Sequence, residues 1–188
     1  MDFIKNDMSK IDKKDSMNIL IFMKDIFSSL TKKLQKGIVV SNEDTLKLVM
    51  KNIKSKKYVF TNKTKDYIIN SCEEKIKNPV IIDKKSKKYI SALKNIQAKF
   101  SNIKKNDIKI KISNMKDENH LMNLTKKIID TLKKTKLNKE IQDKLIIDFF
   151  ISKGFTEAEV KLVIYESVTK SLEQIIKFME IMLKYQKK

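Results

Sequence analysis

Side chains that commonly carry out catalysis are scarce in this sequence. It has one histidine, His120, and one cysteine, Cys72, which lies on an apolar helix face and is expected in a core. Glu73 and Glu74 are adjacent, so on a helix they point about 100° apart and cannot form a paired-carboxylate site alone. One Cys and one His cannot assemble a zinc site, residues 117–119 match no calcium or magnesium motif, and no glycine-rich phosphate loop occurs. We therefore expect no enzymatic activity, no metal and no cofactor.

Lysine is the residue type that could do chemistry here. All 42 basic residues are lysines, and the formal net charge is +19. Arginine makes the commonest specific contact to guanine and clamps carboxylates with two hydrogen bonds, and this chain has none. Lysine binds phosphate as a point charge, so any affinity for nucleic acid should come from the backbone and should fall with salt.

The excess charge is concentrated in the middle of the sequence. Residues 1–50 carry a net charge of +2, residues 51–140 carry +16, and residues 141–188 carry +1. A uniform bias in codon usage would charge the three parts alike. Because sixteen uncompensated charges repel one another, an anionic partner would relieve them. We favour nucleic acid as that partner; a solvated face that keeps the protein soluble, and an anionic membrane or acidic protein, are the alternatives.

The elements that must position these lysines are predicted to be helices. Two glycines and one proline are too few for a sandwich, a barrel or a doubly wound fold. Apolar residues at spacings of three and four predict helices over 16–35, 41–55, 62–78, 84–105 and 117–135. Asp15 or Ser16 can cap the first of these, and Ser41 with Asp44 forms a capping box at the second. Residues 56–62 and 79–83 are predicted to be extended, and residues 107–113 alternate as a half-buried strand does. These segments could form a small sheet, or the strand could be a lone connector.

The C-terminal region is predicted to hold three helices. Asn138 caps the first, which runs through Ser152; Thr156 and Glu159 form a capping box that starts the second; and Thr169 or Ser171 starts the third. The first two helices fit a DNA-reading helix-turn-helix in their apolar positions. Phe150 is large where that unit favours a small residue, and Glu157, Glu159 and Glu166 would repel phosphates.

A second template fits the turn between these helices. The stretch Lys153-Gly154-Phe155 resembles the Met-Gly-Phe loop of ubiquitin-associated domains, over about 46 of 188 residues. The resemblance implies a compact three-helix fold in which this loop and the third helix form a shallow apolar patch. The small residues usual in that family's second helix are mostly missing. We favour a three-helix tail that packs on the rest of the chain or dimerises. Its contact residues would be Gly154, Phe155, Leu162, Phe178, Ile181 and Tyr185.

The sequence contains no segment typical of targeting or membrane insertion. The first ten residues lack an apolar core, and the longest early apolar run, residues 17–23, is far shorter than the roughly 20 residues that span a bilayer. A single cysteine excludes an intramolecular disulfide and fits a reducing compartment. We expect an intracellular, cytoplasmic protein with no membrane partner.

Together these patterns predict a mainly α-helical protein. Residues 1–136 would form a basic, bundle-like helical body with at most a small β element, and residues 137–188 a near-neutral three-helix module. The predicted function is non-catalytic nucleic-acid binding, to DNA rather than RNA, in a regulatory or maintenance role as a homo-oligomer; the alternative is a helical adaptor that binds proteins through the C-terminal module. The predicted phosphate contacts are Lys54, Lys56, Lys57, Lys84, Lys85, Lys87, Lys88, Lys104, Lys105, Lys109, Lys111, Lys133 and Lys134. Tyr58, Tyr89 and Phe100 could stack on bases, although their apolar patterns favour the core.

Overall fold

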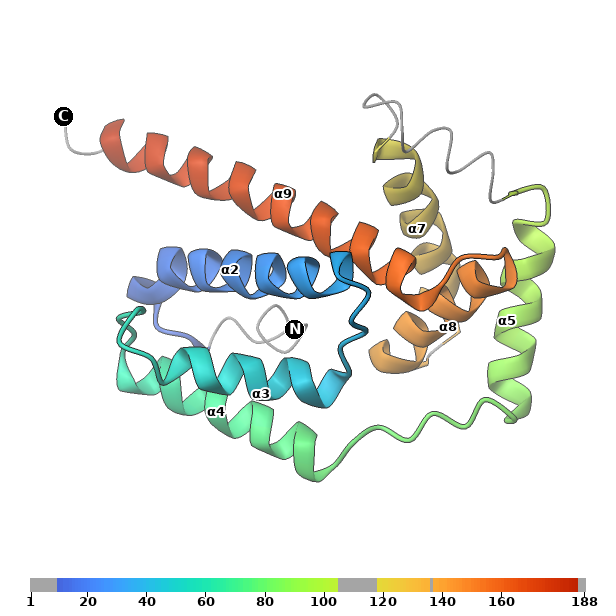
Figure 1. Cartoon of the computed structure of the whole chain (residues 1–188), viewed down its shortest axis with the longest axis horizontal. Helices are drawn as coiled ribbons and strands as arrows, with labels where there is room; N and C mark the ends of the chain where they lie inside the picture. The colour runs from blue at the N-terminus through green and yellow to red at the C-terminus, as the bar shows by residue number, and fades with distance from the viewer. Residues whose placement is uncertain (1–9, 105–117, 136, 186–188) are drawn as a thin grey trace. The chain divides into compact units, whose positions relative to one another are not determined.

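Helices dominate the part of the chain that the structure describes. The computed structural model describes residues 10–104, 118–135 and 137–185, and within these ranges it contains helices and no strand, which confirms the mainly α class. The elements are η2 (Lys13–Asp15), α2 (Ser16–Gln35), α3 (Asn42–Ile53), α4 (Asn62–Lys77), α5 (Lys87–Lys99), α7 (Glu118–Lys133), α8 (Lys139–Ser152) and α9 (Glu157–Tyr185) (Figure 1). The predicted strand at 107–113 lies outside the described residues.

Local sequence sets where most of these helices begin. Ser41 caps α3 in a capping box with Asp44, and Thr156 forms one with Glu159 at the start of α9, both as predicted. Asn138 caps α8 by accepting a hydrogen bond from the Ile141 amide at 2.9 Å.

Both glycines terminate helices. Gly37 and Gly154 have φ of 76° and 89°, the left-handed region that glycine enters without steric strain. After α8, the Gly154 amide bonds the Ile151 carbonyl and the Phe155 amide bonds the Phe150 carbonyl, which is the Schellman pattern. The Phe150 and Phe155 rings meet edge to face, with centroids 5.8 Å apart, as the apolar contact of such a motif requires. The Gly-Phe pair is therefore explained as a helix stop.

The predicted third C-terminal helix is wrong. α9 runs unbroken from Glu157 to Tyr185, through Thr169 and Ser171, where a new helix was predicted to start. No glycine or proline interrupts residues 157–185, so the backbone ladder has no reason to end there. The region has two helices, and the three-helix architecture that the ubiquitin-associated resemblance implies is absent.

The chain divides into two compact units. One comprises residues 1–79 with residues 168–188, and the other comprises residues 80–167. The division does not follow the predicted boundary after residue 136, because α5 and α7 share a hydrophobic core with α8.

In the first unit, α2 packs against α3, and α3 packs against α4. One face of α2 also holds the segment 57–61. The Asn18 side chain donates to the Val59 carbonyl at 2.8 Å, and the Phe22 ring meets the Tyr58 and Phe60 rings edge to face. Residues 56–62 were predicted to be extended, but residues 56–58 form a turn and a bend and Asn62 begins α4. The segment is held by a helix rather than by a partner strand.

Asp15 has a different role from the predicted helix cap. It precedes α2, but its side chain makes no cap hydrogen bond. The buried carboxylate instead accepts from the Thr61 amide at 3.0 Å and from the Thr61 hydroxyl at 2.7 Å. Burial acts to raise the pKa of Asp15, but the hydrogen bonds from Thr64 and Thr61 outweigh it and leave the pKa below its usual value.

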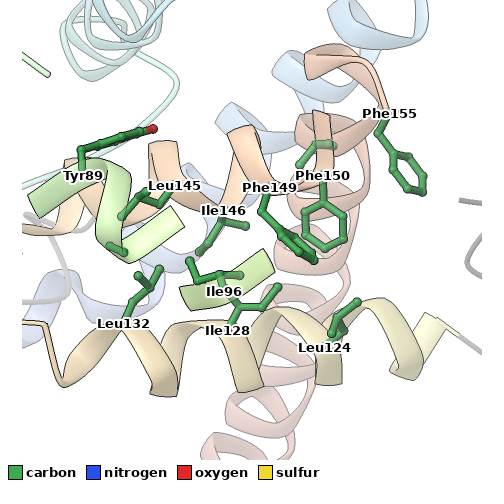
Figure 2. Close-up of a cluster of buried hydrophobic side chains, with 12 residues drawn as sticks. Tyr89, Ile96, Leu124, Ile128, Leu132, Leu145, Ile146, Phe149, Phe150 and Phe155 are labelled. Carbon is green, nitrogen blue, oxygen red and sulfur yellow. The ribbon is translucent and has the colours of Figure 1, made fainter. Parts of the chain in front are cut away.

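In the second unit, α8 packs against both α5 and α7, and these two also touch each other. Their apolar side chains converge in one cluster (Figure 2), whose fully buried members include Ile96, Ile128, Leu145 and Phe149. Val160, at the start of α9, joins the same cluster. This core fixes the orientation of α5, which carries two of the predicted phosphate contacts, Lys87 and Lys88.

Candidate nucleic-acid interface

The candidate interface is the outward side of α5 and the segments on either side of it. Tyr89, Ala92 and Ile96 are buried in the core of the second unit. At 100° per residue, Lys87 and Lys94 fall on the opposite side of the helix, two turns apart, and both are exposed. The packing of α5 therefore turns these two lysines away from the core.

The whole stretch around α5 is free of acidic residues. Between Asp83 and Asp107 the sequence has eight lysines and no carboxylate. The seven of them that the structure describes are all exposed: Lys84, Lys85, Lys87, Lys88, Lys94, Lys99 and Lys104. Lys94 and Lys99 were not among the predicted contacts, and the predicted contacts Lys105, Lys109 and Lys111 lie outside the described residues.

Most of these seven charges are uncompensated. Lys84 forms an ion pair with Asp148 at 2.8 Å. Lys99 donates to the Thr131 hydroxyl at 3.0 Å, a neutral partner that leaves its charge in place. The other five form no ion pair with a carboxylate in the described part of the chain: Lys85, Lys87, Lys88, Lys94 and Lys104. The nearest carboxylate in the sequence, Asp83, accepts from the Lys85 amide at 2.9 Å and forms no ion pair with these five ammonium groups.

The first turn of α5 has the opposite charge from the one that a helix prefers. Acidic residues favour the positive N-terminal end of the helix dipole, and α3, α8 and α9 have them there. In α5 the first turn instead carries Lys87 and Lys88. A bound anion would offset the unfavourable interaction of these cations with the dipole.

Long-range contacts hold both ends of α5 in place. Before the helix, Lys84 and the buried Tyr89 hydroxyl both reach Asp148 Oδ2, each at 2.8 Å. After the helix, the Lys153 ammonium donates to the Ser101 carbonyl at 3.0 Å. The lysines on α5 are thus presented on an element that is anchored to α8 and to the turn after it.

Asp148 is the centre of the anchor before α5. Its side chain is 13% exposed, and Lys144 approaches its other oxygen at 3.5 Å. Burial acts to raise the pKa of Asp148, but the hydrogen bonds from Lys84 and Tyr89 and the two ammonium charges outweigh it and lower the pKa below its usual value. For the Tyr89 phenol, burial and the neighbouring carboxylate both raise the pKa. The carboxylate therefore stays ionised and holds Lys84.

The remaining predicted lysines lie on other elements. Lys54, Lys56 and Lys57 follow α3 and belong to the first unit, and Lys57 pairs with Asp25 at 2.6 Å. At the end of α7, Lys133 pairs with Asp130 at 2.9 Å and Lys134 is exposed.

The fold also spreads the excess charge evenly between the units. Residues 1–79 with 168–188 hold 22 lysines and 12 acidic residues, net +10, while residues 80–167 hold 20 and 11, net +9. The concentration seen along the sequence is therefore not a difference between folded units.

The proposed base-stacking residues are mostly unavailable. Tyr58 and Tyr89 are 6% and 3% exposed, and their hydroxyls donate to Asp25 at 2.7 Å and to Asp148 at 2.8 Å. Phe100 is half-buried, and its ring meets that of Phe149 edge to face. The stacking role suggested for the two tyrosines is wrong, and the core role that their pattern favoured is confirmed.

The residues of catalytic type are placed as follows. Cys72 is fully buried in the first unit, and burial raises the pKa of its thiol to about 11. His120 belongs to α7. Among the described residues, no group of three or more His, Cys, Asp or Glu side chains could hold a metal ion.

The predicted C-terminal contact residues divide into buried and exposed members. Phe155 is buried in the core of the second unit and Leu162 is half-buried. Phe178 and Ile181 are 63% and 51% exposed on α9. Ile175 and Met182, which the sequence pattern assigned to an inward seam, are exposed as well. Tyr185 is the last residue of α9.

The helix-turn-helix reading gains no support from the start of α9. Glu157 pairs with Lys161 at 2.8 Å and lies 3.5 Å from Lys144, so the acidic first turn of α9 is balanced by lysines of the protein itself.

Within the described ranges, no helix is both long enough and apolar enough to cross a membrane.

Comparison with known proteins assigns no class. The chain matches no protein-family model, no curated protein and no solved structure. The function must therefore be argued from the geometry and charge of the molecule.

Proposed function

We propose that this protein binds nucleic acid without catalysis, through lysine contacts to phosphates along α5 and its flanking segments. One observation carries the proposal: seven exposed lysines between residues 84 and 104, with no acidic residue among them and a single ion pair, Lys84 to Asp148. Surface lysines that serve only for solubility can be interspersed with acids, as on α3 and α8, where Lys47 pairs with Glu43 and Lys139 with Asp143.

The chemistry of lysine defines what such an interface can do. An ammonium group neutralises a phosphate and releases its condensed counterions, which gives affinity without reading the bases. Arginine, the residue that most often recognises guanine, is missing from the chain. The proposed activity is therefore binding to the phosphate backbone with little sequence preference and a strong dependence on salt.

Fluorescence anisotropy with a labelled duplex, repeated from 50 to 300 mM salt, tests the proposal. If the five lysines without an ion pair each neutralise one phosphate, the slope of log K against log salt should be about −4.5, since each contact on duplex contributes about −0.9. Absence of binding at 50 mM salt would reject the proposed function.

A second candidate function, protein contact through α9, rests on a separate observation. Ile175, Phe178, Ile181 and Met182 are large apolar side chains that are all exposed on the same two turns of helix. Exposed apolar clusters mark contact surfaces more often than isolated apolar residues do. A protein adaptor or an oligomer would bury this cluster.

Analytical ultracentrifugation of the wild type and of Phe178→Ser tests this candidate. A smaller sedimenting mass for the variant, with an unchanged circular dichroism spectrum, would support self-association through α9. If both chains sediment as the same monomer, the surface is not used between copies, and a search for a different protein partner would replace that idea.

A further inference from the structure

We infer that the nucleic acid bound at α5 is a double helix, held by its backbone and without stacking of bases on aromatic side chains. The inference rests on the proposed function and names the class of ligand for the same surface. Two observations support it. The aromatic side chains of the second unit are buried or half-buried, and the helix that bears the lysines is held at both ends.

Proteins that bind single strands combine a basic groove with exposed aromatic rings on which successive bases stack. Residues 80–167 contain six aromatic residues, and the structure describes all of them. The buried ones are Tyr89, Phe149, Phe150 and Phe155. The other two, Phe100 and Tyr165, are half-buried, so none of the six is fully exposed.

The core uses these rings in specific contacts. Phe149 meets Phe100 edge to face. Phe149 also meets Phe150, and Phe150 meets Phe155, in the same way (Figure 2). The Tyr89 hydroxyl is held by Asp148. Freeing any of these rings to stack on a base would open the core that positions α5. The surface therefore has lysines but no stacking platform.

The arrangement of the lysines suits a regular, stiff ligand. Lys87 and Lys94 are seven residues apart, which separates them by about 10 Å along the helix. Contacts at Asp148 and Ser101 fix both ends of this helix. Since a duplex also has fixed phosphates, both partners are preorganised, whereas a single strand must be ordered at an entropic cost.

Charge density points in the same direction. A duplex carries one charge per about 1.7 Å of axis and a single strand one per about 3.4 Å, so more duplex phosphates lie within reach of the same surface. Counterion release per contact is also larger, about 0.9 against about 0.7 in log K per log salt. At 0.1 M salt, five contacts give a duplex about a tenfold advantage from this difference alone.

The test compares labelled 24-nucleotide single strands with 24-base-pair duplexes of DNA and of RNA, at 0.1 M salt, using the full-length protein. We expect at least one duplex to bind about tenfold or more tightly than the strands, and two duplexes of unrelated sequence to bind equally. Single strands that bind as tightly as both duplexes would overturn the inference while leaving nucleic-acid binding intact. If no probe binds, the proposed function itself fails.

A variant ties the preference to α5. Lys87→Gln with Lys94→Gln should weaken binding to the preferred duplex and reduce its advantage over the single strand. A duplex preference that is unchanged in this variant would show that another surface binds the duplex, which overturns the inference. A large difference between the two unrelated duplex sequences would equally overturn binding through the backbone alone.

Discussion

The double substitution Lys87→Gln with Lys94→Gln addresses the proposed interface most directly. Both side chains are exposed and point away from the core of the second unit. Within the part of the chain that the structure describes, neither forms an ion pair with a carboxylate. Glutamine keeps the length and the helix propensity of lysine and removes the charge. The substitution should therefore change stability by no more than about 0.5 kcal/mol, so that any loss of binding reports on the contacts themselves.

The expected loss follows from counterion release. One phosphate contact changes log K by about 0.9 for each tenfold change in salt, so at 0.1 M salt it contributes a factor of about 8. Removing two contacts should weaken binding about 60-fold at 0.1 M and should reduce the magnitude of the salt slope by about 1.8. Fluorescence anisotropy with a labelled duplex at four or more salt concentrations measures both quantities.

Lys177→Gln with Lys184→Gln is the matched control. These two lysines are exposed on α9, and their removal lowers the net charge by the same two units, from +19 to +17. The control should bind within about twofold of the wild type. Equal weakening by both double variants would mean that binding follows total charge and not the surface of α5, and an unchanged salt slope in the α5 variant would refute the contacts outright.

Three further predictions concern the structure that supports this surface. Asp148→Asn should lower the free energy of unfolding at pH 7 by about 2 kcal/mol in a urea titration, because a carboxylate that accepts charge-assisted hydrogen bonds is lost. The pKa of Asp148 is lowered by folding, so its contribution is complete above the unfolded value of about 3.9 and decreases as pH falls through the folded value; a difference that stays constant as the pH is lowered from 7 to below about 3.9 would contradict this. Phe149→Ala should cost about 3–5 kcal/mol in the same assay, since the ring is fully buried, and a cost below about 1 kcal/mol would place it outside the core. Gly154→Ala should cost about 1–2 kcal/mol, because alanine is strained at a φ of 89°, and an unchanged thermal midpoint would argue against that backbone geometry.

Much of the secondary structure was predictable because its signals are local. The capping boxes at Ser41 and Thr156 and the cap at Asn138 involve residues three positions apart, and all three form as predicted. The apolar spacings also identified buried residues on most helices, although Ile175 and Met182 on α9 are exposed. Asp15 shows where this approach fails: its sequence position suits a helix cap, yet its carboxylate bonds Thr61, 46 residues away.

The sequence predicted where the candidate site lies, but not which of its lysines keep an uncompensated charge. The acid-free run of lysines is visible in the sequence, and its described lysines are exposed on α5 and on the segments that flank it. The pairing of Lys84 with Asp148 and of Lys57 with Asp25 removes two lysines from the set of uncompensated charges. These partners are 64 and 32 residues apart, so no spacing rule could have identified them.

The sequence by itself determined the helical class, the lack of arginine and the location of the acid-free lysine run, because composition and short-range periodicity are properties of the chain alone. Tertiary structure decided which lysines keep an uncompensated charge, that four of the six aromatic residues in 80–167 are buried, and that α9 is one helix whose C-terminal part exposes large apolar side chains. These features depend on contacts between residues far apart in the chain. Such contacts form, and stabilise the protein, only once the helices have packed.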